Sequence, residues 1–265
     1  MKKITIIGAG TMGIIFCEAL HNWDYDCIPT ISSPAGDNLE KLRIKYPDAK
    51  IMNNNVEAVA EADVIILAVK PQNFSVVAGE LKGKLSQDVL IISIMAGVSI
   101  EKIKEFLNVK KVVRSMPNLG SRVKKSMTVW TSSNCDEEAK DMASSLFLGI
   151  GKELYVEDEN MIDKATAVSG SGPGFFFFIL EKWLESVEAL GFTREQAEKL
   201  VLTTLDGSLD LLKKDMKPVD LVNQVASKGG TTEAGLKVLE EADLRLIWDK
   251  VLQTAEARAK ELSRG

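Results

Sequence analysis

Histidine is almost missing from this chain, and cysteine is rare. The only histidine, His21, falls near the end of the first predicted helix, where a surface or half-buried position is more common than a catalytic one. A single histidine argues against a Ser–His–Asp triad and against a multi-histidine metal site. The three cysteines, Cys17, Cys27 and Cys135, form no close pair and no metal-ligand spacing, so we expect reduced thiols in packed structure and no bound metal.

The chain also lacks a strong excess of positive charge and a long apolar run. Its 33 basic and 38 acidic side chains give a formal net charge of −5, whereas nucleic-acid binding requires dense positive charge. The longest apolar runs, Val64–Val69 and Phe175–Leu180, are far shorter than the ~20 residues that cross a bilayer. The start, Lys2-Lys3 and an apolar stretch, resembles a signal peptide, but glycines interrupt it and a strand–turn–helix explains it better. We therefore expect a cytoplasmic protein without nucleic-acid or membrane partners.

Strand-like and helix-like segments alternate over the first ~150 residues, and this alternation predicts a parallel sheet wrapped by helices. The expected strands are Lys3–Ile7, Asp26–Ile31, Asp63–Val69, Val89–Ile94, Lys111–Ser115 and Met127–Thr131. The expected helices are Met12–His21, Asp37–Tyr46, Val56–Ala62, Asn73–Lys84, Ile100–Leu107 and Asp136–Leu148.

From about Asp158 onward, strand signals nearly vanish and helical patterns take over. The expected helices are Met161–Val168, Gly174–Leu190, Arg194–Lys214, Pro218–Val225, Thr231–Glu240 and Leu244–Leu262. The helix after Pro173 is apolar nearly all round in its first turns, so it must be buried. A domain of only ~105 residues struggles to bury it alone, and we slightly prefer burial in a dimer over a central position within one monomer.

A glycine-rich turn lies between the first predicted strand and the first helix. Residues Gly8–Gly13 read GxGxxG, in the strand–turn–helix context that dinucleotide binding requires. Gly8 permits the tight turn, Gly10 lets the backbone approach a pyrophosphate, and Gly13 lets the helix pack close to the strand. The alternative is a glycine-rich turn without a ligand. We expect the cofactor to meet the helix N-terminus at Gly8, Gly10, Thr11, Met12 and Gly13.

The end of the second strand distinguishes between the two nicotinamide cofactors. A carboxylate there would bind the 2′-hydroxyl of NAD and repel the 2′-phosphate of NADP. This chain has Ser32 and Ser33 instead, with no carboxylate before Asp37 and no arginine beside them. Small hydroxyls can donate to a phosphate, so we expect NADPH, with NADH as an accepted second cofactor.

Together these patterns predict an α/β fold with two domains. Residues 1–157 form a Rossmann-type parallel-sheet domain that binds a dinucleotide. Residues 158–265 form an all-helical domain for substrate binding and dimerisation.

Five further segments carry specific motifs, and they are Ala68–Gln72, Ser93–Ser99, Arg114–Asn118, Val168–Pro173 and Ser227–Thr232. Their order and spacing, with the glycine turn, span residues 4 to about 240. Together they resemble the pyrroline-5-carboxylate reductase family. The last of them resembles the family's Ser-Pro-Gly-Gly-Thr-Thr loop.

The resemblance implies an activity and a site. The activity is reduction of the cyclic imine Δ1-pyrroline-5-carboxylate to L-proline by hydride transfer from NAD(P)H, in a homodimer that in some members assembles further into a decamer. The residues implied at the adenosine and ribose side of the cofactor are Asn55, Val69, Lys70 and Pro71, and those near the nicotinamide are Ala96, Gly97 and Asn118. The residues implied to hold the substrate are Ser227, Gly229, Gly230, Thr231 and Thr232, with Thr232 reaching the ring nitrogen as the catalytic residue.

A physical argument supports the substrate loop. Its glycines introduce a helix near Thr231, whose N–H groups can converge on a carboxylate, although a plain helix N-cap would use the same residues. The loop also departs from the family, because Lys228 replaces proline. Leu119-Gly120 replaces the usual Thr-Pro after Asn118, and Ser121–Ser126 fits the family poorly.

Because these departures lie near the nicotinamide or the substrate, reduction of a related imine is an open alternative. Two other functions also remain open from the sequence. One is a β-hydroxyacid dehydrogenase of the same plan, which would need a lysine in the helical domain such as Lys164 or Lys182. The other is a nucleotide-binding paralogue without catalytic activity, for which the departures at Lys228 and Leu119-Gly120 are the only support.

Overall fold

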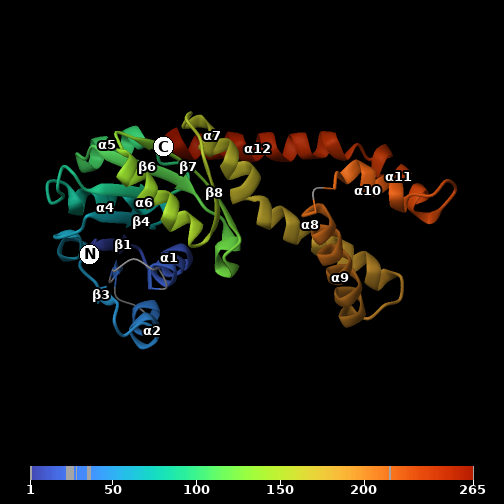
Figure 1. The fold of residues 1–265 in the computed structure, drawn as a ribbon, viewed down its shortest axis with the longest axis horizontal. Helices are drawn as coiled ribbons and strands as arrows, with labels where there is room; N and C mark the ends of the chain where they lie inside the picture. Colours follow the sequence, from blue (N-terminus) through green and yellow to red (C-terminus); the bar gives the residue numbers. More distant parts are fainter. Residues whose placement is uncertain (1, 22–26, 28, 35–36, 215, 265) are drawn as a thin grey trace. The chain divides into compact units, whose positions relative to one another are not determined.

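One eight-stranded sheet organises the N-terminal part of the chain (Figure 1). The computed structural model describes residues 2–21, 27, 29–34, 37–214 and 216–264. The strands lie in the order β3-β2-β1-β4-β5-β6-β7-β8, and neighbouring strands are parallel except for β6 and β7. Their bounds are β1 (Ile4–Ile7), β2 (Thr30–Ser32), β3 (Lys50–Met52), β4 (Val64–Leu67), β5 (Leu90–Ser93), β6 (Lys111–Met116), β7 (Ser126–Ser133) and β8 (Gly151–Tyr155).

Helices cover both faces of this sheet (Figure 1). In β4, Ile66 packs into one core, whereas Ile65 and Leu67 pack into the other. A strand buried on both faces needs a continuous apolar run, which β4 has. The helices of the first core are α1 (Thr11–His21), α2 (Asp37–Lys45) and α6 (Glu137–Leu148), and those of the second are α3 (Asn55–Val59), α4 (Phe74–Leu81) and α5 (Ile100–Leu107).

The predicted alternation of strands and helices is confirmed, but two strands were missed and one direction was wrong. The missed strands, β3 and β8, are the two edges of the sheet, where β8 carries exposed polar residues and β3 is only Lys50–Met52. The sheet is not wholly parallel, because β7 runs antiparallel to β6. The link between them is residues 117–125, which is shorter than the dozen or more residues of a parallel crossover. The strand expected at Asp26–Ile31 is found as β2, and residues 26 and 28 lie outside the described residues.

The second half of the chain is helical, as predicted. The elements after β8 are α7 (Asn160–Ala165), a π-helical turn (Thr166–Gly170), α8 (Gly172–Ala189), α9 (Arg194–Leu212), α10 (Pro218–Val225), α11 (Thr231–Glu241) and α12 (Leu244–Arg264). The chain separates into two compact units, Met1–Pro173 with Gln253–Gly265, and Gly174–Leu252. The boundary at residues 157 and 158 marks where the strands end, and we keep it as a proposed functional boundary.

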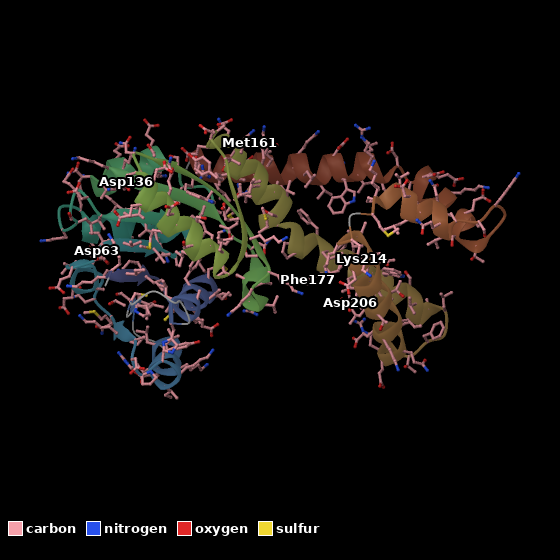
Figure 2. All side chains as sticks on the ribbon, in the orientation of Figure 1. Asp63, Asp136, Met161, Phe177, Asp206 and Lys214 are labelled. Atoms are coloured by element: carbon pink, nitrogen blue, oxygen red, sulfur yellow. The ribbon has the colours of Figure 1, made fainter. Side chains whose placement is uncertain are left out.

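The second unit has a small core of its own. Leu184 and Val187 of α8 pack with Ala197 and Val201 of α9. Several large apolar residues of α8 are exposed to solvent in the single chain. One of them is Phe177 (Figure 2), which is 52% exposed. We call this set the apolar surface of α8, and it consists of Phe176, Phe177, Phe178, Ile179 and Trp183. Burial of α8 within one chain is therefore incomplete.

No helix in the described part of the chain is both long and apolar enough to cross a membrane.

A buried ion-pair network fixes three segments of the first unit to one another. Arg114 of β6 is 2% exposed and donates through Nη1 to Glu159 Oε1 (2.9 Å) and through Nη2 to Asp163 Oδ1 (2.5 Å). Glu159 Oε1 also accepts a hydrogen bond from the backbone N–H of Ile100 (2.9 Å). The Arg114 guanidinium therefore joins β6 to the segment leading through α7, and the Glu159 carboxylate joins that segment to the start of α5.

We expect Arg114→Met to lower the free energy of unfolding by about 3–5 kcal/mol, because it leaves the buried Asp163 carboxylate without its cation. Urea denaturation followed by tryptophan fluorescence measures this, with the buried Trp130 as a probe in the same unit. Arg43→Met is the matched control, since Arg43 pairs with the exposed Glu40, and it should cost less than about 1 kcal/mol. Equal losses in the two variants would contradict the prediction.

Candidate functional site

The turn between β1 and α1 is too tightly packed for side chains at two of its glycines. Gly8 has φ +110°, and a Cβ there would lie 2.7 Å from the backbone oxygen of Ala68 at the end of β4. A Cβ at Gly13 would lie 1.9 Å from the oxygen of Gly8. Gly10 differs, because a Cβ there would meet nothing within 4 Å. Gly8 and Gly13 therefore fix the turn against the sheet, whereas Gly10 faces open space.

A cavity of about 400 Å³ opens at this turn. It lies where β1, β2 and β4 end, which is the edge at which parallel α/β sheets bind their ligands. The cavity is large enough for the adenosine and phosphate part of a dinucleotide, and the open space at Gly10 leaves room for a diphosphate beside the first turn of α1. The predicted cofactor residues that line it are Gly8, Gly10, Ser32, Ser33, Asn55, Val69 and Lys70.

Other predicted cofactor residues flank the cavity without lining it. Pro71 starts a short 3-10 helix (Pro71–Asn73) directly after Lys70. Thr11 and Gly13 lie in the first turn of α1. Met12 lies beside the loop that follows β6, because Ser121 Oγ is 3.7 Å from Met12 Sδ.

A chain of hydrogen bonds crosses the cavity wall at the end of β2. Ser32 Oγ donates to Asn55 Oδ1 (2.8 Å), and Asn55 Nδ2 donates to Glu80 Oε2 (2.8 Å). Glu80 of α4 lines the cavity, and it is not among the residues predicted from the sequence. A signal was present, because Asn73, Val76, Val77 and Glu80 share one helical face.

The residues expected near the nicotinamide lie after the next two strands. Ala96 and Gly97 follow β5, and Gly97 has φ +70°. Asn118 follows β6, and its Oδ1 accepts the N–H of Gly120 (2.9 Å) to cap a short 3-10 helix, Leu119–Val123. A Cβ at Gly120 would lie 2.6 Å from the oxygen of Lys125, so this departure from the family serves a tight turn. The structure places these residues along the same edge of the sheet as the cavity, but outside its lining.

The Ser169–Pro173 turn is part of a π-helical insertion between α7 and α8. Ser171 N donates to Thr166 O (2.8 Å), and Ser169 Oγ donates to Ala165 O (3.1 Å). A Cβ at Gly170 would lie 2.7 Å from Cε of Met116 at the end of β6. The insertion therefore packs against the strand that leads to Asn118, and π insertions are frequent at functional sites.

The Ser227–Thr232 loop forms the entrance to α11 in the second unit. Gly229 has φ +73° and donates its N–H to Glu233 Oε2 (2.7 Å), while Gly230 N donates to Ser227 O (2.9 Å). Gly230 is the N-cap and supplies no side-chain cap. The first N–H groups of a helix have no intrahelical partner, so those of Thr231 and Thr232 are directed to the space before the helix. Lys228 is exposed.

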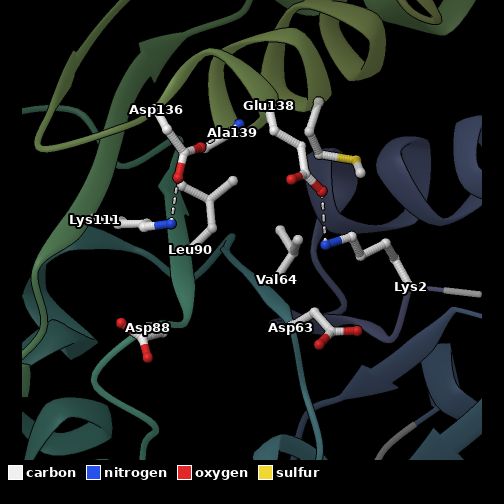
Figure 3. Close-up of a pocket in the computed structure, with 10 residues that line it drawn as sticks. Lys2, Asp63, Val64, Asp88, Leu90, Lys111, Asp136, Glu138 and Ala139 are labelled. Atoms are coloured by element: carbon white, nitrogen blue, oxygen red, sulfur yellow. Dashed lines mark hydrogen bonds and ion pairs between the residues drawn. The ribbon is translucent and has the colours of Figure 1, made fainter.

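A second pocket lies at the opposite, amino-terminal edge of the sheet (Figure 3). Its two lysines form ion pairs, Lys111 with Asp136 (2.6 Å) and Lys2 with Glu138 (3.0 Å). The hydrogen bond from Lys111 lowers the pKa of Asp136. Asp63 accepts a hydrogen bond from the backbone N–H of Lys3 (2.8 Å). With a volume of about 80 Å³ and four carboxylates against two lysines in its lining, this pocket is a small ion-pair cluster with an excess of negative charge.

The cysteines and the histidine take no part in the cavity. Burial raises the pKa of Cys17 to about 11 and raises that of Cys135 as well, so neither is a thiolate near neutral pH. Cys27 lies against Leu20, with its Sγ 3.8 Å from the backbone oxygen. His21 is exposed and stacks edge-on against Tyr46. These positions agree with the predicted structural roles.

The fold and the glycine-lined cavity define a dinucleotide-binding oxidoreductase fold. A family model described as "NADP oxidoreductase coenzyme F420-dependent" matches residues 3–97. A second, described as "Pyrroline-5-carboxylate reductase dimerisation", matches residues 159–262.

Full-length relatives make the family specific. A pyrroline-5-carboxylate reductase of Pseudomonas aeruginosa is 32% identical and covers 98% of this chain and 97% of its own. The solved pyrroline-5-carboxylate reductase of Coxiella burnetii is 36% identical, with a TM-score of 0.89 over 99% of this chain and 98% of its own. The NADP-bound pyrroline carboxylate reductase of Plasmodium falciparum is 27% identical, with a TM-score of 0.87 over 99% and 98%. The chain belongs to the pyrroline-5-carboxylate reductase family.

We expect Gly10→Ala to fold normally but to weaken NADPH binding by about tenfold or more. The new methyl group meets no protein atom within 4 Å, yet it occupies the space that a diphosphate needs. Fluorescence titration gives the dissociation constant, and thermal denaturation gives the stability. Gly79→Ala on α4 is the control, because its Cβ is also unhindered and Gly79 does not line the cavity. Unchanged affinity in Gly10→Ala would exclude the diphosphate from this turn.

Proposed function

We propose that this chain reduces Δ1-pyrroline-5-carboxylate to L-proline, as a step of proline biosynthesis, with NADPH as hydride donor and NADH as an accepted alternative. The observation that carries the proposal is the relationship to pyrroline-5-carboxylate reductases at 32–33% identity over 98% of the chain. The relationship includes both the cavity-bearing sheet and the helical domain. It is much more specific than a GxGxxG turn alone.

The cavity supports the cofactor assignment. Gly8, Gly10 and the first turn of α1 would hold the diphosphate through backbone N–H groups. Asn55 and Ser33 would contact the adenosine ribose. When bound, the reduced nicotinamide supplies a hydride. The residues that would complete the cofactor site are Thr11, Met12, Gly13, Ser32, Val69, Lys70 and Pro71 on the adenosine side, and Ala96, Gly97 and Asn118 at the nicotinamide.

The helix entrance at α11 suits a small carboxylic acid. N–H groups at its first turn would bind the substrate carboxylate, with Ser227, Gly229, Gly230 and Thr231 shaping the loop. Lys228, which is exposed, adds positive charge in place of the proline found in the family.

Thr232 is the proposed catalytic residue. Reduction adds a hydride to the carbon of the C=N bond and a proton to its nitrogen. A cyclic imine is basic enough to be partly protonated near neutral pH, so the site needs no strong acid such as histidine. The Thr232 hydroxyl would orient the ring nitrogen and relay a proton from water, and most of the acceleration would come from holding the substrate in near-attack geometry.

We also propose a homodimer, with a larger assembly such as a decamer as a further step, and a cytoplasmic location. The apolar surface of α8 supports dimerisation, since monomers rarely expose large apolar patches, and this helix lies within the segment matched by the dimerisation family model. The cytoplasmic location rests on the requirement for reduced nicotinamide cofactor and on thiols that are packed in the fold.

The purified protein should oxidise NADPH saturably when Δ1-pyrroline-5-carboxylate is added, and proline should accumulate in equal amount. Absorbance at the nicotinamide band and amino-acid analysis measure the two. A β-hydroxyacid offered with the oxidised cofactor tests the dehydrogenase alternative. Cofactor binding without turnover of either substrate would favour the non-catalytic paralogue and overturn the proposal.

Thr232→Ala should lower turnover of the imine about 100-fold or more, which is the usual contribution of a positioned proton-transfer group. The dissociation constant for NADPH should change by less than about twofold, because the cavity lies in another unit. Thr232→Ser keeps the hydroxyl and should stay within about tenfold of the natural chain. Undiminished turnover in the alanine variant would remove Thr232 from the mechanism.

Phe177→Glu should weaken self-association by at least about tenfold, since it would place a carboxylate in an apolar interface. Sedimentation velocity at several protein concentrations measures the change. Ile44→Glu is the matched control, because Ile44 on α2 is 83% exposed in the first unit. A dimer that is equally stable in both variants would show that the apolar surface of α8 is not the interface.

A further inference from the structure

We propose that Glu80 lowers the preference of this enzyme for the 2′-phosphate of NADPH over the 2′-hydroxyl of NADH. The inference rests on the proposed use of a nicotinamide dinucleotide. It concerns the end of β2, where Ser32 and Ser33 carry no charge and the sequence alone favoured NADPH. The negative charge at this place is that of Glu80 on α4, which is distant from β2 in the sequence but lines the same cavity.

The hydrogen-bond chain has only one consistent proton arrangement. A carboxylate can only accept, so the amide of Asn55 must turn its Nδ2 toward Glu80 (2.8 Å). Its Oδ1 then faces Ser32 and accepts the hydroxyl proton of Ser32 (2.8 Å). One N–H of Asn55 and the single hydroxyl proton of Ser32 are thus used inside the protein. Glu80 therefore orients both groups and uses one N–H of Asn55 that could otherwise reach a phosphate.

The charge balance of the cavity points the same way. Among the described residues that line it, Lys70 carries the positive charge and Glu80 the negative one, so their formal charges cancel. A phosphate monoester carries about −1.5 to −2 charges at neutral pH, whereas a hydroxyl carries none. Glu80 is exposed, so its repulsion is moderated by solvent. The cavity consequently accepts either cofactor instead of selecting the phosphate strongly.

Glu80→Gln isolates the charge from the geometry. A glutamine carbonyl can still accept from Asn55 Nδ2, so the hydrogen-bond chain can persist while the negative charge is lost. Glu57→Gln is a close control. Glu57 lies on α3, the helix that begins with Asn55, and accepts a hydrogen bond from Nδ2 of the N-cap residue Asn54 (2.8 Å). Unlike Glu80, it does not line the cavity.

Calorimetric titration with two nucleotide fragments tests the inference without catalysis. The fragments are 2′,5′-ADP and 5′-AMP, which differ only in the 2′-phosphate. In Glu80→Gln, the dissociation constant for 2′,5′-ADP should fall about three- to tenfold, as expected for removal of a nearby partly screened charge, and that for 5′-AMP should change by less than about twofold. Glu57→Gln should leave both constants near those of the natural chain. Raising the salt concentration should narrow the difference between the natural chain and Glu80→Gln.

Each contrary result is decisive. Equal changes for both fragments, no change for 2′,5′-ADP, or an equal effect of Glu57→Gln would overturn the role of Glu80. Failure of the natural chain to bind either fragment would overturn the nucleotide site together with this inference. Fragment binding as expected, in a protein that does not reduce Δ1-pyrroline-5-carboxylate, would sink only the proposed activity. Circular dichroism confirms that the variants fold, which is expected because Glu80 is exposed.

Discussion

The close approach of the β1–α1 turn to the end of β4 is the constraint on which the nucleotide site depends. Gly8 lies against the backbone of Ala68, and Gly13 lies against Gly8, at separations that leave no room for a Cβ. The contact fixes where α1 begins and therefore where its unpaired N–H groups point. Because β1, β2 and β4 are parallel neighbours, their carboxyl ends then form one rim, and Ser32, Asn55 and Lys70 come to a single cavity.

Local patterns predicted most of this arrangement. The run Val64–Val69, apolar at every position, has the composition of a strand buried on both faces, and the structure has β4 there. The edge strands were harder, because β3 and β8 each pair with one neighbouring strand only. Both carry a lysine, and β8 also carries a glutamate. The antiparallel direction of β7 follows from the short connection between β6 and β7, residues 117–125. The length of this connection could have been counted from the sequence. Composition alone does not report it.

Contacts between distant segments were beyond local patterns. Arg114 was visible as part of a family motif, but nothing in the sequence pairs it with Glu159 and Asp163, which lie 45 and 49 residues further along. The helical spacing of Glu80 places it on one face of α4, but nothing in the sequence pairs it with a residue of α3. Its partner Asn55 is 25 residues away, and only the fold brings α3 and α4 together. Arginine, glutamate and asparagine are common residue types, and Arg114, Glu80 and Asn55 acquire their roles only from the residues that the fold places beside them.

The π-helical turn Thr166–Gly170 has a consequence for how this family tolerates changes in length. A π turn holds one residue more than a regular helix of the same rise, and here it sits between α7 and α8. Because the wider turn absorbs its extra residue locally, deleting one residue would convert the segment to a regular helix and leave α8 in nearly the same rotational phase. Changes of side chain are more restricted than this change of length. A Cβ at Gly170 would lie 2.7 Å from Cε of Met116, and Ala167 is buried.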